Sequence, residues 1–262
     1  MRDGMSLWHE TRGTGPDLVL LHGWGMSSDI WGDFTDRLAE RYRVTLIDLP
    51  GLGRSAPAGD MSLDMVVEAL LDAAPERAHW VGWSLGGQLA LACAERAPER
   101  LKSLSLIAAN PCFIAREDWP CAMAPQVFDA FVASLADNKA KTLQRFAALQ
   151  TRGSASARDE LKRLKGVMAT AEPQALAAAL VLLQADLRPT LAALNCPAQL
   201  ILGTEDQLVP AGLATSARKL NHRLGAQVLE QSAHLPFVSH ADEVLIMLNA
   251  LVRQVDGADA AG

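Results

Sequence analysis

A serine placed between two glycines is the part of this sequence that most directly indicates chemistry. The stretch Gly82-Trp83-Ser84-Leu85-Gly86 follows an apolar run, residues 78–81, and precedes a helical pattern rich in Ala and Leu, residues 88–97. A G-x-S-x-G spacing between a strand and a helix is that of a nucleophile elbow, a sharp turn that strains the backbone of its serine. Glycine is needed on both sides because a side chain would collide with the turned backbone. The pattern predicts Ser84 as a nucleophile at a helix N-terminus, which favours developing negative charge.

A serine hydroxyl becomes a good nucleophile only when a base takes its proton, and that base needs an orienting carboxylate. Both partners are expected after the nucleophile in the chain, in the order acid, then histidine. His234 lies in a loop after the strand-like run 226–229, where the general base is expected. His240 is the alternative, but residues 239–242 are typical of the start of a final helix. We therefore predict His234 as the base.

Two adjacent carboxylates follow the strand-like run that precedes this histidine. Glu205 and Asp206 lie in the stretch Gly203-Thr204-Glu205-Asp206-Gln207-Leu208-Val209-Pro210. Asp206 fits the spacing G-x-x-D-x-x-V-P, so we predict Asp206 rather than Glu205 as the acid that orients the base.

A tetrahedral oxyanion needs preorganised N–H donors. We expect one donor to be the backbone amide of Leu85, directly after the nucleophile. The other should come from the loop after an early strand, residues 21–25, at the amide of Trp24. His22 in this loop is an alternative base, but His234 already occupies that position. We expect His22 to hold the loop in shape.

Short apolar runs that alternate with helical patterns indicate the elements that position these residues. The apolar runs are residues 18–21, 44–47, 78–81, 104–108 and 199–202, and helical patterns include residues 62–74 and 87–97. Such alternation predicts an α/β fold, a mostly parallel sheet with helices on both faces.

Between about residues 110 and 190 the sequence has no strand signal and only helical stretches. An inserted helical block predicts a cap over the carboxyl edge of the sheet, where such sheets bind ligands. We expect an α/β core of residues 1–109 and 191–256, a cap of residues 110–190, and a small, polar, disordered tail of residues 257–262.

The composition excludes several other classes of protein. The 262 residues are 50% hydrophobic and 21% charged, which is ordinary for a globular chain, and the net charge of −6 argues against general nucleic-acid binding. No apolar run is long enough to span a membrane, and no secretory signal is present. Cys93, Cys112, Cys121 and Cys196 lack metal-ligand or disulfide spacing. We expect a cytoplasmic monomer that uses no metal or cofactor.

Taken together, these motifs resemble the α/β-hydrolase family. They are His22-Gly23-Trp24-Gly25, Asp48-Leu49-Pro50-Gly51-Leu52-Gly53-Arg54-Ser55, Gly82-Trp83-Ser84-Leu85-Gly86-Gly87, Asp206 and His234. With Asn110-Pro111-Cys112-Phe113 and Arg145-Phe146-Ala147-Ala148-Leu149-Gln150-Thr151, the chain is similar within that family to the pimeloyl-acyl-carrier protein methyl ester esterases of biotin synthesis. The similarity runs from about Trp8 to Val252. It implies hydrolysis of the methyl ester at the far end of a pimeloyl chain held on acyl-carrier protein.

The resemblance also implies two sets of contacts, carried over by position. Substrate would touch Trp24, Ser84, Leu85, Phe146, Ala147, Ala148, Leu149, Gln150 and His234. The carrier protein would be gripped by Lys141, Arg145, Arg158 and Lys162. Two of these four are lysines where the family pattern has arginine, so the charge is kept but the bidentate geometry is not.

The charge distribution favours an acidic partner independently of this resemblance. Residues 139–165 hold eight basic residues against Asp159 and Glu160, a local charge of +6 in a chain of net charge −6. Charge runs are usually solvated helix faces. The local reversal of sign nevertheless favours acyl-carrier protein as the partner.

Other functions fit parts of the same pattern. A broader short-chain carboxylesterase or a C–C bond hydrolase would use the same fold and the same residues. A dehalogenase is disfavoured because that chemistry uses a carboxylate at the elbow. A non-catalytic ligand receptor on a hydrolase scaffold is the alternative from a different class, but it has no need of a complete set of Ser84, Asp206 and His234.

We expect Ser84→Ala to abolish ester hydrolysis and to leave the fold intact, because alanine removes only the hydroxyl. The loss in kcat should be on the order of 10³-fold or more, as for other triad members. Turnover of a small ester, with circular dichroism as the control for folding, measures it. Activity near that of the wild type would end the serine-hydrolase interpretation.

Overall fold

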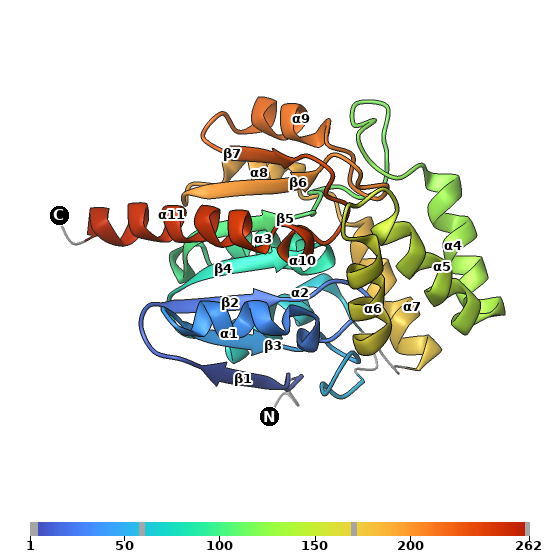
Figure 1. Cartoon of the computed structure of the whole chain (residues 1–262), viewed down its shortest axis with the longest axis horizontal. Helices are drawn as coiled ribbons and strands as arrows, with labels where there is room; N and C mark the ends of the chain where they lie inside the picture. Colours follow the sequence, from blue (N-terminus) through green and yellow to red (C-terminus); the bar gives the residue numbers. More distant parts are fainter. Residues whose placement is uncertain (1–4, 58–60, 169–171, 260–262) are drawn as a thin grey trace.

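A seven-stranded sheet forms the centre of the computed structural model, which describes residues 5–57, 61–168 and 172–259 (Figure 1). The strand order is β1-β3-β2-β4-β5-β6-β7, and β1 pairs antiparallel with β3 while the other neighbouring strands pair in parallel. The strands are β1 (His9–Arg12), β2 (Asp17–Leu21), β3 (Arg43–Ile47), β4 (Ala78–Trp83), β5 (Leu101–Ile107), β6 (Ala198–Gly203) and β7 (Gly225–Leu229). The predicted α/β class is confirmed.

Strand β1 is the strand for which the sequence carries no apolar run. Its four residues are mostly exposed because it lies at the edge of the sheet. An edge strand exposes much of its surface to solvent, so polar residues such as those of β1 are tolerated there. The sequence of β1 therefore has no hydrophobic pattern from which a strand could be predicted.

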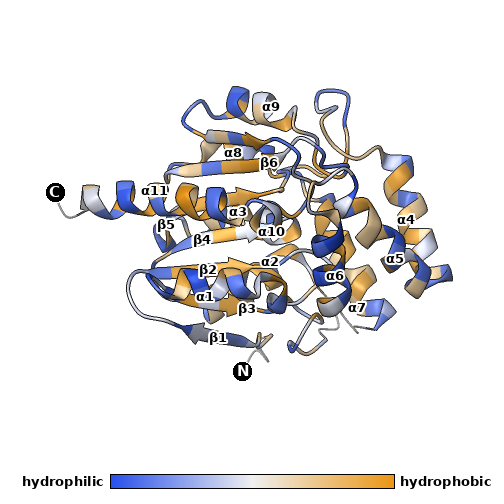
Figure 2. Cartoon of the chain, viewed as in Figure 1, coloured by the Kyte–Doolittle hydropathy of each residue, from blue (hydrophilic) through white to orange (hydrophobic). Residues whose placement is uncertain are grey.

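Helices cover both faces of the sheet, as alternate side chains of the strands require. Val19 and Leu21 of β2 belong to one core cluster with helices α2, α3, α8 and α9, whereas Leu18 and Leu20 belong to a second cluster with α1 and α11. The helices are α1 (Asp33–Ala39), α2 (Leu63–Ala73), α3 (Leu85–Arg96), α8 (Arg188–Ala193), α9 (Leu213–Leu220), α10 (Pro236–Ser239) and α11 (Ala241–Asp259), with the 3-10 turns η1 (Ser28–Trp31), η2 (Pro98–Arg100) and η3 (Leu182–Gln184). In Figure 2 the central strands are mostly hydrophobic. Burial on both faces explains why these strands read as continuous apolar runs.

Four helices between β5 and β6 lie beyond the carboxyl ends of the strands (Figure 1). They are α4 (Pro125–Asp137), α5 (Lys139–Thr151), α6 (Ala157–Val167) and α7 (Pro173–Val181). We call these four helices the cap. The segment before α4 is expected from the sequence to be helical, but residues 114–123 form an irregular loop. Two isolated bridges, Ile114–Met123 and Arg116–Trp119, hold this loop. Within the described residues, no helix is both long and apolar enough to cross a membrane.

Two expected boundaries differ from the structure. The boundary at residues 190/191 falls inside α8, which packs against α3 and α9 and so lies with the core. The tail expected at residues 257–262 starts later, because α11 continues to Asp259; residues 260–262 lie outside the described part. Helix α11 continues because Val255 is buried and Asp256 accepts a hydrogen bond from Lys102 Nζ at 2.9 Å. The small polar residues after Val255 gave no sign of this anchor.

Helix α3 approaches strand β2 so closely that only glycine fits between them. A Cβ atom on Gly86 would lie 2.4 Å from the carbonyl oxygen of Leu21 and 2.5 Å from that of His22. Real Cβ atoms do not approach backbone that closely. The elbow and the 22–25 loop can therefore pack this tightly only because residue 86 is glycine. This close contact fixes the distance between the nucleophile and the expected oxyanion loop.

We expect Gly86→Ala to destabilise the protein by about 1–3 kcal/mol or more, because the new methyl group must push backbone apart. Chemical denaturation measures the loss. Gly212→Ala is the matched control, since a Cβ there meets nothing within 4 Å and Gly212 has a φ of −57°. That control should change stability by about +0.4 to +1 kcal/mol at most. Equal effects of the two variants would contradict this account of the packing.

Candidate active site

The backbone of Ser84 is held in a conformation that L-residues rarely adopt. Ser84 lies between the last residue of β4 and the first residue of α3, with a φ of 55° and a ψ of −120°. Such a conformation costs on the order of 1–3 kcal/mol and persists only where the surroundings enforce it. They do so here: the Ser84 amide donates to Ile107 O at 2.9 Å, and a Cβ on Gly82 would lie 2.4 Å from Gly86 O. The elbow predicted from the glycine spacing is therefore present.

The three residues predicted for the triad come together at this elbow. The Ser84 hydroxyl lies 3.0 Å from His234 Nε2, and His234 Nδ1 lies 2.7 Å from Asp206 Oδ2. Because the carboxylate can only accept, Nδ1 carries the proton and Nε2 is free to accept the serine proton. All three residues are buried, and Ser84 keeps 8% of its surface exposed. The arrangement can activate a hydroxyl for attack on an acyl carbon.

Asp206 is fixed by the loop that carries it. Its Oδ1 accepts hydrogen bonds from the amides of Leu208 at 2.8 Å and Val209 at 3.0 Å, which leaves Oδ2 for the imidazole. The neighbouring Glu205 does not reach His234; its carboxylate accepts a 3.3 Å hydrogen bond from the Thr204 hydroxyl and lies beside Gly153. The structure thus places Asp206, and not Glu205, against the imidazole.

Trp83 of the elbow holds the loop of His234 through a hydrogen bond and a ring contact. Trp83 Nε1 donates to the backbone oxygen of His234 at 2.7 Å, and the two rings lie 5.5 Å apart. Trp83 is buried, and Phe237 packs on its edge at 5.4 Å. Sequence reasoning missed this role, since the position between glycine and serine in G-x-S-x-G carries no fixed residue type.

The two other candidate histidines are engaged elsewhere. His22 Nδ1 lies 2.9 Å from Gly23 O, and its Nε2 accepts the amide of Leu49 at 2.9 Å. Burial lowers the pKa of His22, so the neutral ring bridges two loops, in agreement with its expected role in loop shape. His240 lies one residue before α11, with its Nδ1 2.9 Å from the Ser239 hydroxyl.

An ion pair between the buried Asp48 and the partly exposed Arg54 supports the loop from which Trp24 projects. Asp48 accepts hydrogen bonds from the Ser28 amide at 2.7 Å and from the Arg54 amide and Nε at 2.8 and 2.9 Å. Burial acts to raise the pKa of Asp48, but the hydrogen bonds and nearby charges outweigh it and the pKa is lowered. The Trp24 indole donates to Leu176 O on α7 at 2.9 Å. The amides of Trp24 and Leu85 as oxyanion donors stay a prediction; that of Leu85 lies in the first turn of α3, whose N–H groups have no intrahelical acceptor.

An apolar cavity between the elbow and the cap begins at Ser84. Its lining consists of Trp24, Ser84, Phe113, Met123, Val127, Phe128, Phe131, Phe146, Leu149, Leu180, Leu183 and Leu208. Trp24, Phe131 and Phe146 form an aromatic cluster with ring centroids 5.2 to 5.3 Å apart. Val127 is 56% exposed and so marks the outer end of the cavity. Such a lining suits an aliphatic chain rather than a polar ligand.

Only part of the expected run 146–150 faces this cavity. Phe146 and Leu149 line it, as residues three apart on one helix face do. Ala148 is exposed and Ala147 is buried in the other core cluster. Gln150 is buried behind the catalytic loop, where its backbone oxygen accepts the amide of His234 at 3.0 Å. Phe146 and Leu149 are therefore the residues of this run that line the cavity, and contact of Ala147, Ala148 and Gln150 with substrate stays a prediction.

The four expected carrier-protein residues form two exposed pairs. Lys141 and Arg145 lie four residues apart on α5, and Arg158 and Lys162 four apart on α6, so each pair shares a helix face. Among the described residues none of the four has an ion-pair partner. These charges are available to a partner.

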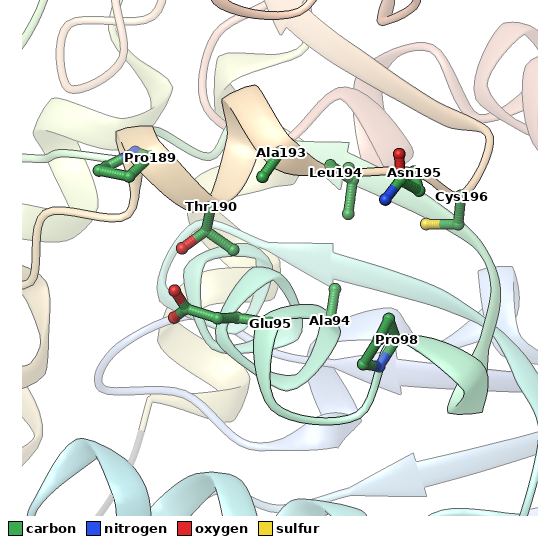
Figure 3. Close-up of a pocket in the computed structure, with 9 residues that line it drawn as sticks. All are labelled: Ala94, Glu95, Pro98, Pro189, Thr190, Ala193, Leu194, Asn195 and Cys196. Carbon is green, nitrogen blue, oxygen red and sulfur yellow. The ribbon is translucent and has the colours of Figure 1, made fainter.

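A second hollow lies between α3 and α8 (Figure 3) and shares no lining residue with the cavity at Ser84. It is lined by Ala94, Glu95, Pro98, Pro189, Thr190, Ala193, Leu194, Asn195 and Cys196. Glu95 and Thr190 face each other across this hollow (Figure 3). Burial raises the pKa of the Cys196 thiol to about 11, so this thiol is no nucleophile. Over the described ranges, no group of three or more His, Cys, Asp or Glu could hold a metal.

Comparisons with known proteins agree with this geometry. The alpha/beta hydrolase family matches residues 18–245 of the chain. A pimeloyl-acyl-carrier protein methyl ester esterase from Serratia marcescens is 40% identical over 94% of this chain and 98% of its own, and one from Shewanella sp. (strain MR-7) is 44% identical over 90% of each. The solved esterase from Exiguobacterium antarcticum is 23% identical, covers 97% of both chains and superposes with a TM-score of 0.82, which shows a shared fold.

Changing the two adjacent carboxylates separately tests which one orients the imidazole. Asp206→Asn should lower kcat on the order of 10⁴-fold, the loss seen in a well-studied triad, because an amide favours the wrong tautomer of His234. Glu205→Gln removes the same charge one residue earlier and should leave kcat close to the wild-type value. Steady-state kinetics on a small ester measure both variants. A larger loss for Glu205→Gln would mean that the acid is placed one residue late.

Proposed function

Because the chain belongs to the alpha/beta hydrolase family, and within it to the pimeloyl-acyl-carrier protein methyl ester esterases, we propose that it hydrolyses the methyl ester of a pimeloyl chain carried on acyl-carrier protein. The observation that carries this proposal is the hydrogen-bonded set of Ser84, His234 and Asp206 at one end of an apolar cavity. The reaction releases methanol and leaves a free carboxylate on the chain. We place this step in the synthesis of the pimelate part of biotin.

The proposed reaction proceeds through an acyl-enzyme. Ser84 Oγ attacks the ester carbonyl while His234 Nε2 accepts its proton, and the tetrahedral oxyanion receives hydrogen bonds from the amides of Leu85 and Trp24. The imidazolium then gives that proton to the departing methoxide, which leaves as methanol. His234 next activates a water molecule, which hydrolyses the acyl-enzyme and restores the serine. Asp206 holds the imidazole in one tautomer and stabilises its positive charge throughout.

The cavity supports a substrate with an aliphatic chain whose ester is at the far end. Ser84 is part of the lining, and the cap helices α4, α5 and α7 supply much of the apolar wall. An ester carried at the end of a chain of methylene groups can reach the nucleophile while its other end stays outside. The carrier protein would then remain against the surface of the cap, near the exposed Val127.

The basic residues of α5 and α6 support an acidic carrier as the partner. Lys141, Arg145, Arg158 and Lys162 are exposed and without ion pairs among the described residues, so their charge acts on what approaches the cap. Complementary charge mainly accelerates encounter and selects partners. A short-chain carboxylesterase or a C–C bond hydrolase would have no need of this surface. A non-catalytic receptor would have no need of the triad.

Action as a cytoplasmic monomer is a further part of the proposal. The cytoplasmic location is supported by Cys93, Cys112, Cys121 and Cys196, all of which are free thiols in the structure. Disulfides are rare in proteins of a reducing compartment.

Two experiments test the proposed substrate. The gene should restore growth without biotin to a bacterial strain that lacks its own pimeloyl-ester esterase, and the Ser84→Ala gene should not. The purified protein should remove the methyl group from synthetic pimeloyl-acyl-carrier protein methyl ester, as followed by mass spectrometry. Turnover of small esters without turnover of the carrier-linked ester would favour the short-chain carboxylesterase.

Charge reversal on the cap should separate carrier recognition from chemistry. We expect Arg145→Glu with Arg158→Glu to raise KM for the carrier-linked ester on the order of tenfold at low salt and to flatten its salt dependence. A small free ester should be hydrolysed almost normally. The matched control is Arg218→Glu with Lys219→Glu on α9, which changes the net charge equally on exposed residues away from the cap.

The substrate comparison also covers the risk at Arg145, which adjoins Phe146 of the cavity. Kinetics with both substrates, each at low and high salt, decide the outcome. Equal losses on the two substrates would show that the basic residues serve cap packing. An equal effect of the α9 control would show that only net charge matters.

A further inference from the structure

Glu160 on cap helix α6 is a fully buried carboxyl group that the proposed mechanism does not use. It is 0% exposed, whereas its neighbours Arg158, Asp159 and Lys162 are exposed. Its Oε1 accepts a hydrogen bond from the Ser154 hydroxyl at 2.9 Å, and its buried Oε2 has no hydrogen-bond partner among the described residues. A buried, half-satisfied carboxyl costs stability, so its presence calls for a compensating role.

The Glu160 carboxyl lies against the segment that carries the catalytic histidine. The hydroxyl of Ser239, the last residue of α10, faces the carboxyl. Ser239 Oγ is in turn 3.1 Å from Ser232 Oγ, so the two serines link both ends of the segment around His234. Helix α6 packs directly on α10. A change at Glu160 is therefore transmitted to the loop of the base.

The same corner of the cap holds this loop through its backbone. Gln150 O accepts the amide of His234 at 3.0 Å, and the Ala155 amide donates to Gln231 O at 3.0 Å. Gln231 has a φ of 58°, a conformation that needs such restraint. Residues 150–160 thus contact the His234 loop at three points, of which Glu160 is the one that can carry charge.

The charge of Glu160 acts on the catalytic pair. Burial raises the pKa of Glu160 to about 7, against the opposing effects of the nearby Ser154 and Ser239 hydroxyls and of the charge of His234. The charged or titratable groups on the elements packed around it are Asp206, Glu205, His234, His240, Asp29 and Asp33, then Lys139, Lys141 and Arg145 on α5 with Arg152 at its end, and Arg158, Asp159, Lys162, Arg163 and Lys165 on α6 itself. Of these, His234 and Asp206 act on the carboxyl. Near neutral pH Glu160 is partly ionised, and its ionised form favours the imidazolium.

We propose that Glu160 is a positioning residue for the catalytic base: its carboxyl seats the Ser232–Ser239 segment against the cap and adds a second negative charge beside the Asp206–His234 pair. The inference rests on the proposed function only in taking His234 as the base. It also gives α6 two tasks, since Arg158 and Lys162 point outward from the helix whose inner face carries Glu160. The cap is then part of the catalytic machinery and not only a cover for the acyl chain.

The first test uses the unmodified protein. The side-chain carboxyl signal of Glu160, assigned by its loss in Glu160→Gln and followed by NMR against pH, should change near pH 7. The imidazole signal of His234, assigned by its loss in His234→Asn, should respond over the same pH range. A His234 signal that does not respond when Glu160 ionises would overturn the proposal.

The second test compares Glu160→Gln with Asp159→Asn, which removes one exposed charge from the adjacent position of the same helix. Loss of a nearby negative charge makes the imidazolium less stable. We therefore expect Glu160→Gln to move the acid limb of the kcat profile to lower pH by about 0.5 to 1 pH unit. At pH 8 kcat should fall on the order of three- to tenfold with KM unchanged. Asp159→Asn should change none of these values. Glu160→Asp keeps a carboxyl group and should retain most of the wild-type kcat and its pH dependence.

A fall in kcat with no displacement of its acid limb would show that Glu160 only fills space, and would overturn the proposal. Unchanged kinetics in Glu160→Gln, together with an unchanged His234 signal, would also overturn it. The NMR readout needs no turnover, so the two proposals fail separately. A wild-type protein that hydrolyses no ester, but whose His234 signal responds near pH 7 and loses this response in Glu160→Gln, would refute the proposed function and support this inference.

Discussion

The left-handed backbone of Ser84 is the constraint on which the rest of the structure depends. A residue with φ of 55° and ψ of −120° can be kept there only if neighbouring backbone leaves it no other conformation. Glycines at 82 and 86 allow that crowding: their missing side chains let the elbow touch its own helix and the carbonyls of Leu21 and His22. The strain costs on the order of 1–3 kcal/mol. In return the hydroxyl projects from the end of β4 toward the space between sheet and cap, with the N-terminus of α3 behind it.

The imidazole of His234 reaches this hydroxyl from a loop that contacts with other elements hold in place. Trp83 holds the backbone oxygen of His234 from the side of the sheet, and Gln150 holds its amide from the side of the cap. Asp206 fixes the ring, and two backbone amides fix Asp206. Each partner lies far from His234 in the chain and comes from a different element. The geometry of the triad is thus a property of the assembled core and cap, and movement of the cap would be felt at the imidazole.

The cap combines three environments that need different residues. Its inner surface is apolar and aromatic, its outer surface on α5 and α6 is basic, and the contact of α6 with α10 holds a buried carboxyl. Helical periodicity makes this possible, because residues three or four apart share a face while their neighbours point elsewhere. One short helix can therefore present Arg158 and Lys162 to a partner and Glu160 to the catalytic loop. That separation keeps the screened surface charges apart from the unscreened buried one.

The sequence by itself determined the features that local pattern controls. Apolar runs located the central strands, glycine spacing located the elbow, and the G-x-x-D-x-x-V-P spacing selected Asp206 over Glu205. Chain order, with a position in the loop after the last strand, then selected His234. Tertiary structure alone decided which residues of 146–150 face the cavity, that α11 continues past Val255, that the polar edge strand β1 exists, and that Trp83, Gln150 and Glu160 lie against the segment around His234. The reason is physical: a strand, a turn or a helix face is fixed by neighbours in the chain, whereas these contacts join residues brought together only when the cap packs on the sheet.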